Sequence, residues 1–163
     1  MNLAHVHLLL NHLPVLGIPF ALALYGLGVV QKSNDLKRAS YLFAMLIAVL
    51  TVPTYLTGEP AEDLVEGVAG VTEAFIEKHE EPALVSLVLT LMAGALGVVQ
   101  YFSAAIGARL KFVQEYAGAI RVAYVLALIA SSIALGYTAM QGGEIRHTEI
   151  RAGALGEGAS QGQ

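Results

Sequence analysis

The chain has 163 residues, of which 56% are hydrophobic and 13% are charged, against about 25% charged residues in an ordinary soluble domain. Its formal net charge is −4, and it has no cysteine, which excludes disulfides, thiolate metal sites, iron–sulfur clusters and covalent c-type haem attachment. No glycine-rich phosphate loop, Ser-His-Asp pattern or basic nucleic-acid patch occurs, so the sequence does not support hydrolase, nucleotide-binding or nucleic-acid-binding functions. The composition is typical of an integral membrane protein.

Four segments are apolar over the roughly 20 residues that a helix needs to cross a bilayer. They cover about residues 8–30, 39–57, 83–107 and 119–140. The first is not preceded by a basic region and is too long for a signal peptide, so we expect it to remain in the mature protein. The sequence predicts an all-α integral membrane four-helix bundle, a single domain over residues 1–163 with a flexible tail from about residue 152.

The first segment begins with three histidines, His5, His7 and His12. In a continuous helix His5 and His12 are separated by about 700°, close to two full turns, so they share a face, whereas His7 is turned about 200° from His5. We therefore expect His12, the deepest of the three, to face a site, and His7 to face headgroups or solvent. Pro14 and Pro19 remove backbone donors here and predict a bend, which either opens space for a cofactor or serves helix packing alone.

Charged residues are segregated along the chain, which predicts how the protein sits in the membrane. Six of the nine Lys and Arg residues lie in the two loops that follow the first and third segments: Lys32, Lys37, Arg38, Arg109, Lys111 and Arg121. Eight carboxylates lie between the second and third segments: Glu59, Glu62, Asp63, Glu66, Glu73, Glu77, Glu80 and Glu81. By the positive-inside rule, both termini and the acidic segment are predicted on the periplasmic side of a bacterial inner membrane.

The acidic segment over residues 58–81 also carries apolar residues at steps of four, three and four, namely Leu64, Val68, Val71 and Phe75. This spacing predicts an amphipathic helix over about residues 61–80. Such a helix lies on the membrane surface with its apolar side inward. We expect it to cover the outer mouth of the bundle.

The segment after the fourth apolar stretch reads QGGEIRHTEIR. Gly142 and Gly143 are expected to interrupt the helix, and Glu144 and His147 then stand at the Glu-x-x-His spacing of di-iron carboxylate bundles, although in a single copy. All five histidines are expected at the outer end, where polar residues also collect for purely interfacial reasons. We expect His12, His79 and His147 to converge on one site at this mouth.

The stretches HLLLNHLPVLG, TGEPAE, IEKHEE and GGEIRHTEIR together resemble a group of small bacterial four-helix membrane proteins. That group is distantly similar to a larger domain family of unknown function, whose first helix opens with a His-x-x-x-x-His-x-Pro-like segment. Relatives in the larger family occur joined to cytochrome c or Rieske-type electron carriers. The resemblance implies redox work near the periplasmic face, with the bilayer and other membrane or periplasmic redox proteins as partners.

Three functions remain open from the residues, and whether the protein is an enzyme is also open. The first is a b-type haem electron-transfer subunit, with candidate ligands His12, His79 and His147, His5 for a second haem, and Arg146 or Lys78 for the propionates. The second is a non-haem iron, copper or zinc protein that combines these histidines with carboxylates, the candidates being Glu59, Glu62, Glu80, Glu144 and Glu149. The third is a cofactor-free anchoring subunit of a respiratory or photosynthetic complex. A homo-oligomer is compatible with each of them.

Overall fold

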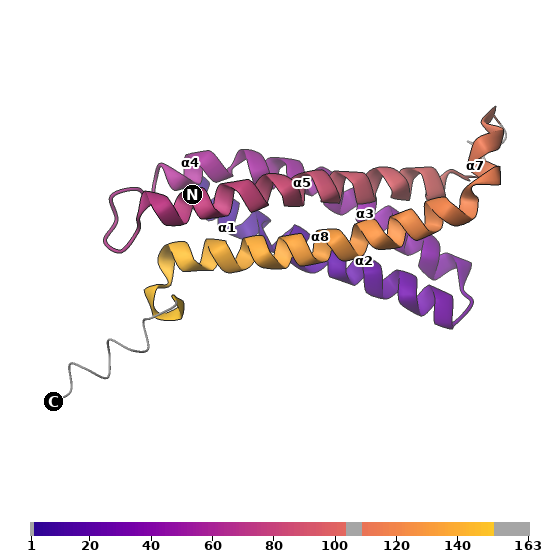
Figure 1. Cartoon of the computed structure of the whole chain (residues 1–163), viewed down its shortest axis with the longest axis horizontal. Coiled ribbons are helices and arrows are strands. Elements are labelled where there is room, and N and C mark those ends of the chain that lie inside the picture. The colour runs from indigo at the N-terminus through magenta and orange to yellow at the C-terminus, as the bar shows by residue number, and fades with distance from the viewer. Residues whose placement is uncertain (1, 104–108, 152–163) are drawn as a thin grey trace.

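The computed structural model describes residues 2–103 and 109–151, which form helices and turns with no strand in these two ranges (Figure 1). The helices in chain order are α1 (Leu3–Leu10), α2 (His12–Val30), α3 (Asn34–Leu56), α4 (Gly58–Glu62), α5 (Glu73–Tyr101), α7 (Lys111–Glu115) and α8 (Ala117–Arg146), followed by a 3-10 turn, η1 (Thr148–Ile150). The predicted tail from residue 152 lies outside the described residues.

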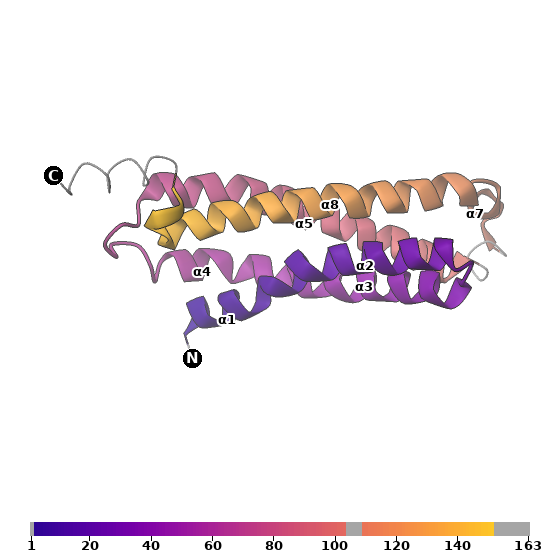
Figure 2. The ribbon, with the colours of Figure 1, turned by 90° about the horizontal axis from the view of Figure 1, so that it is seen from below.

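Four helical stretches are long and apolar enough to cross a membrane, with mean hydropathy between 1.8 and 2.2. They are Leu3–Val30, Asn34–Leu56, Glu73–Tyr101 and Ala117–Arg146. They run alternately up and down, and α2 packs on α3 and α8 while α5 packs on the same two helices (Figure 2). The predicted all-α four-helix bundle is confirmed, and the four apolar helices indicate a multi-pass membrane protein in contact with the lipid bilayer.

Small residues allow the helices to approach closely, as they commonly do in membranes, where burial of apolar surface gives little driving force. A Cβ atom at Gly94 of α5 would overlap the side chain of Ala48 on α3. A Cβ atom at Gly97 would lie 3.0 Å from the backbone oxygen of Tyr41. Between α2 and α3, Gly17 has the same role against Ile47. Most large apolar side chains can therefore point outward to lipid while the backbones pack.

The first membrane span is broken at Asn11, between α1 and α2. Pro14 has no N–H to donate to the carbonyl of Leu10, four residues earlier. The Thr54 hydroxyl of α3 lies 3.4 Å from that oxygen, and its shorter hydrogen bond, at 2.9 Å, is to the Leu50 oxygen of its own helix. α1 is consequently displaced from the axis of α2 and packs on α4 and the end of α3.

Two predicted features of the connections differ in the structure. Residues 63–72 form turns rather than the expected surface helix, because Gly67 and Gly70 adopt positive φ angles of 78° and 84°, which are incompatible with a helix. The helix resumes at Glu73 as the first turns of α5. The expected break at Gly142 and Gly143 is wrong, since α8 continues to Arg146.

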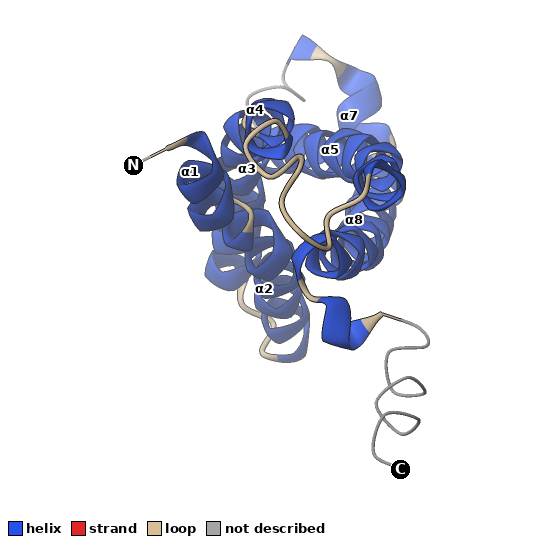
Figure 3. Ribbon diagram, turned by 90° about the vertical axis from the view of Figure 1, so that its left-hand side faces the viewer, coloured by secondary structure: helices blue, strands red, loops and turns tan. Residues whose placement is uncertain are grey.

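The two ends of the bundle differ in their chemistry, and Figure 3 views the molecule from the end that carries α1 and α4. We call the acidic end the one formed by α1, α4, residues 63–72, the start of α5 and the end of α8. The opposite end carries the loop after α2 and the connection between α5 and α8, and we call it the basic end. All eight carboxylates of residues 58–81 lie at the acidic end, and the six basic residues of the two loops lie at or near the basic end.

Candidate functional site at the acidic end

His7 projects from α1 towards the end of α3 and is half-buried. Its Nδ1 lies 3.0 Å from the backbone oxygen of Thr54 and 3.2 Å from the Thr57 hydroxyl. Gly58 stands beside the ring, where a Cβ atom would lie 3.8 Å from His7 Cε1. The helix break at Asn11 is what brings this imidazole against α3.

His79 projects from the second turn of α5 towards α8 and is also half-buried. Its Nδ1 lies 3.0 Å from the backbone oxygen of Thr138. The ring rests directly on the backbone of Gly142, where a Cβ atom would lie 3.0 Å from Cε1 and 3.2 Å from Nδ1. Glycine is therefore needed at this position of α8 for the imidazole to occupy its place.

These two hydrogen bonds determine which ring nitrogen is available. A backbone carbonyl can only accept, so Nδ1 carries the proton in both His7 and His79, and in the neutral ring Nε2 holds a free lone pair. Histidines that bind metals almost always have their other ring N–H held in this way by a carbonyl or carboxylate.

The other three histidines lie outside this pair, and all three are exposed. His5 Nδ1 contacts the Asn2 side chain at 2.6 Å, and His12 Nδ1 contacts the backbone oxygen of Leu8 in its own segment at 2.7 Å. His147 Nδ1 contacts Glu149 at 2.8 Å, with both side chains more than 60% exposed. The ring of each of the three is thus engaged by its own neighbours in sequence.

The predicted orientation of His7 is wrong, because that prediction assumed one continuous helix through Asn11. Asn11 keeps helical dihedral angles, φ −63° and ψ −26°, but the bend beside it redirects the axis of α1, so that His7 faces the end of α3. Pro14 was the available signal, since a proline near the start of an apolar run marks a helix boundary as well as a bend.

Carboxylates surround a pocket of about 360 Å³ at the same end of the bundle. It is lined mainly by Glu59, Glu62, Asp63, Glu66, Glu73, Glu77 and Glu80. Partial burial raises the pKa of Glu62 to about 7, and the neighbouring charges of Glu80, Glu59 and Asp63 act in the same direction. A proton shared near neutral pH therefore reduces the repulsion among these groups.

The remaining predicted residues lie at the end of α8. Glu144 is half-exposed and Arg146 is exposed. Glu149 is fully exposed, and hydrogen bonds from its own backbone N–H and from His147 lower its pKa. In residues 2–103 and 109–151, no group of three or more His, Asp or Glu side chains is arranged to hold a metal ion. The structure thus does not bring His12, His79 and His147 together as one metal-binding group.

Arg151 is a further residue of this end that the sequence did not reveal. Its guanidinium donates to the backbone oxygens of Glu144, Ile145 and Gly70, at 2.8, 3.1 and 2.7 Å. It also stacks on the Phe75 ring at 3.9 Å from the centroid. It ties the turns of residues 63–72 and the start of α5 to the end of α8.

The fold and this site define a four-span helical membrane protein with two inward-facing imidazoles at its acidic end. Comparison of the chain with protein-family models, curated proteins and solved structures finds no match. We therefore infer the chemistry of the site from the positions and contacts of its residues. Each of the two rings, in its neutral form, leaves Nε2 unprotonated.

Proposed function

We propose that the protein is a membrane redox subunit that holds b-type haem through His7 and His79 at the acidic end and transfers electrons there. The observation that carries the proposal is that each half-buried imidazole has its Nδ1 bound by a backbone carbonyl of another helix, at 3.0 Å in both cases. Haem iron in a bis-histidine protein takes its two axial ligands from the protein in this way. The haem would supply one-electron redox chemistry.

The donor set and its surroundings fit this group better than a non-haem metal. A structural or catalytic metal site draws three or four ligands from the protein, and the described part of the chain contains no such group. Gly58 stands beside the His7 ring without crowding it, and Gly142 lets the His79 ring pack directly on the backbone of α8. Arg146 is exposed at the end of α8 and forms no ion pair with any described carboxylate, so its guanidinium is free to meet a propionate.

A cofactor-free anchoring subunit is a second candidate, and one observation favours it. Each of the two imidazole hydrogen bonds joins two helices, His7 linking α1 to α3 and His79 linking α5 to α8. Such bonds contribute to helix association in a membrane whether or not a cofactor is present. Under this alternative the histidines act only as bridges between helices.

An optical spectrum distinguishes the two candidates. The protein is purified in detergent from cells supplied with haem precursor, and spectra are recorded oxidised and dithionite-reduced, with elemental analysis of iron, copper and zinc. We expect the α and β bands of b-type haem and one iron per haem. Stoichiometric metal without these bands would establish a non-haem site, and neither signal would leave the anchoring role.

Matched histidine variants test the ligands. His7→Ala and His79→Ala should each abolish the reduced bands, whereas His12→Ala and His147→Ala should retain them, because those two rings are exposed and engaged within their own segments. Circular dichroism and gel filtration show whether each variant still folds. Loss of haem in a well-folded His12→Ala variant, with His7→Ala unaffected, would contradict the assignment.

We also propose that the acidic end faces the periplasm, since the basic loops at the other end favour the cytoplasm. The chain has no cysteine, so single-cysteine variants report one position each. A membrane-impermeant maleimide should label Thr72→Cys in intact cells and should label Gln31→Cys only after lysis. The reverse pattern would invert the topology.

A further inference from the structure

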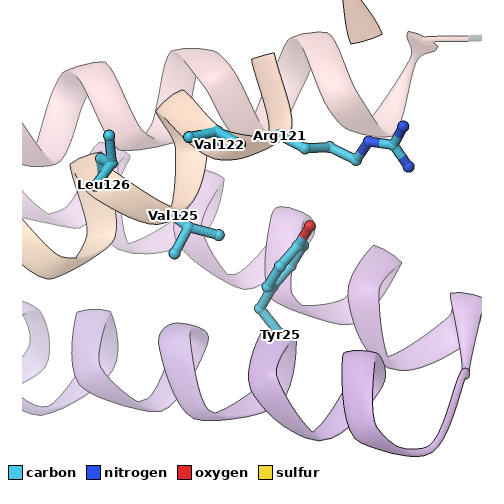
Figure 4. Close-up of a pocket in the computed structure, with 5 residues that line it drawn as sticks. All are labelled: Tyr25, Arg121, Val122, Val125 and Leu126. Atoms are coloured by element: carbon cyan, nitrogen blue, oxygen red, sulfur yellow. The ribbon is translucent and has the colours of Figure 1, made fainter. Parts of the chain in front are cut away.

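A second pocket, of about 220 Å³, lies near the basic end (Figure 4). It is formed where α2 meets α8 and is lined by Tyr25, Arg121, Val122, Val125 and Leu126. Arg121 lies in the second turn of α8, and Tyr25 lies five residues before the end of α2. At about 1.5 Å per residue, both side chains stand within about 8 Å of the ends of their helices, at the depth where lipid headgroups meet acyl chains.

Contacts with neighbouring residues fix the orientation of the Arg121 and Tyr25 side chains. Arg121 Nε donates to the backbone oxygen of Ala117 at 3.1 Å, which orients the guanidinium along α8. Its terminal nitrogens form no hydrogen bond or ion pair with any residue in the described ranges. The Tyr25 ring packs against Tyr41 and Tyr124, with centroids 5.9 and 5.6 Å away. Its hydroxyl points towards the helix that carries Arg121 (Figure 4).

The rest of the pocket is aliphatic and faces outward. Val122 and Leu126 are 60% and 59% exposed, on the surface that a bilayer would cover. No carboxylate lines the pocket. The wall of the pocket is almost entirely aliphatic, and the Arg121 guanidinium and the Tyr25 hydroxyl lie at its end nearest the basic loops.

We propose that this pocket binds an anionic phospholipid, with the phosphodiester at Arg121 and Tyr25 and an acyl chain along Val122 and Leu126. A guanidinium matches the paired oxygens of a phosphate and stays charged at every physiological pH. The excess of basic residues at the same end attracts anionic lipid into the surrounding leaflet, and basic pockets between membrane helices are a recurring site for such headgroups. The proposal is independent of haem binding.

Native mass spectrometry of the purified full chain provides the test, with phosphatidylglycerol and phosphatidylcholine titrated separately. Wild-type protein should retain one phosphatidylglycerol molecule preferentially. Arg121→Gln should weaken this adduct roughly tenfold, as expected for loss of a charged hydrogen bond. Arg121→Lys should give a smaller loss, because it keeps the charge but not the paired donors. Tyr25→Phe should also weaken it, by less than Arg121→Gln.

Lys111→Gln is the matched control, since it removes one positive charge from the same end outside the pocket. Phosphatidylglycerol binding should be nearly unchanged in this variant. Equal weakening by Lys111→Gln and Arg121→Gln would show that only diffuse charge attracts the lipid, and would overturn the proposal. Equal retention of phosphatidylcholine would overturn the proposal, because binding would then not depend on the net charge of the lipid. Displacement of the lipid by millimolar inorganic phosphate would also overturn it, because binding would then not depend on the acyl chain.

Discussion

The two ends of the bundle handle buried polar groups in opposite ways. In the core near the basic end, Ser40 and Tyr124 satisfy one another. Ser40 donates to the backbone oxygen of Ala21 at 2.7 Å, and its oxygen then accepts from the Tyr124 hydroxyl at 2.8 Å. The rings of Tyr25, Tyr41 and Tyr124 pack with centroids 5.0 to 5.9 Å apart. This is a closed network in which each member orients another.

At the acidic end the two inward-facing imidazoles are each oriented by one hydrogen bond and keep a second nitrogen that can bind a further partner. His7 and His79 each have one nitrogen bound to a backbone carbonyl and a second left with its lone pair. Glu62 has a pKa raised to about 7 among other carboxylates. A closed hydrogen-bond network stabilises a fold, whereas a binding site requires oriented groups with unpaired donor or acceptor atoms. The comparison assigns scaffolding to the interior of the basic end and chemistry to the acidic end.

The largest effect is expected from removing the centre of the basic-end network. Tyr124 is fully buried, and Tyr124→Ala should lower the free energy of unfolding by about 3 to 5 kcal/mol through the cavity it leaves. Unfolding in mixed detergent–dodecyl sulfate micelles measures this loss. Tyr137→Ala, in the same helix but 51% exposed, should cost less than about 1 kcal/mol. Similar losses in both variants would mean that Tyr124 contributes no special packing.

A smaller, local effect is expected from Arg151→Gln at the acidic end. Loss of the hydrogen bonds to three backbone oxygens should cost about 1 to 2 kcal/mol. It should also speed hydrogen exchange over residues 63–72, which the guanidinium ties to α8. Arg146→Gln removes the same charge from a nearby exposed side chain and should leave that exchange unchanged. Equal protection in both variants would rule out the tethering role.

A pair of glycine substitutions isolates the contact between His79 and α8. Alanine stabilises an exposed helix interior by about 1 kcal/mol relative to glycine, and Gly136→Ala, which has open space around it, should show that gain. Gly142→Ala should show no such gain in stability, because the new Cβ atom would push the His79 ring and weaken its hydrogen bond to the Thr138 oxygen. Imidazole ¹⁵N chemical shifts of His79 should change only in Gly142→Ala. If both variants gain equally, the ring does not rest on Gly142.

The smallest effect is expected from the pH dependence of the acidic pocket. The pKa of Glu62 is higher in the folded protein, about 7, than its ordinary value of 4.5, so the folded state binds more protons between these values. The free energy of unfolding should therefore fall as pH rises from about 4.5 to about 7 and level off above it. Glu62→Gln should flatten this dependence. Glu81→Gln, at the same end but outside the pocket, should preserve it.

Much of the architecture could be predicted because it depends on how hydropathy and charge are distributed along the chain. Four apolar stretches and two basic loops define the spans and the chemical difference between the ends, whatever the packing details. The surface helix was not predictable from the spacing of Leu64, Val68 and Val71, because positive φ angles at Gly67 and Gly70 outweigh an apolar periodicity. Gly142 and Gly143 show the converse, since both stay helical within α8 and Gly142 packs against His79.

The candidate site shows where sequence reasoning ends. That histidines and carboxylates gather at one end follows from their positions between the spans, and His79 was among the expected residues. Which imidazoles turn inward depends on the rotation of each helix about its axis. The direction of that axis matters as well, because the bend near Asn11 turns α1 so that His7 contacts α3 while His12 stays exposed.

The sequence by itself determined four membrane-spanning segments, their alternation and the separation of acidic from basic loops, because hydropathy and charge act over whole segments. Only the tertiary structure decided that His7 binds to the end of α3 and that His79 binds to α8. That choice depends on contacts between residues far apart in the chain, with Thr54 and Thr138 supplying the carbonyls and Gly58 and Gly142 leaving the space. No local pattern encodes such contacts, since each depends on where another helix lies.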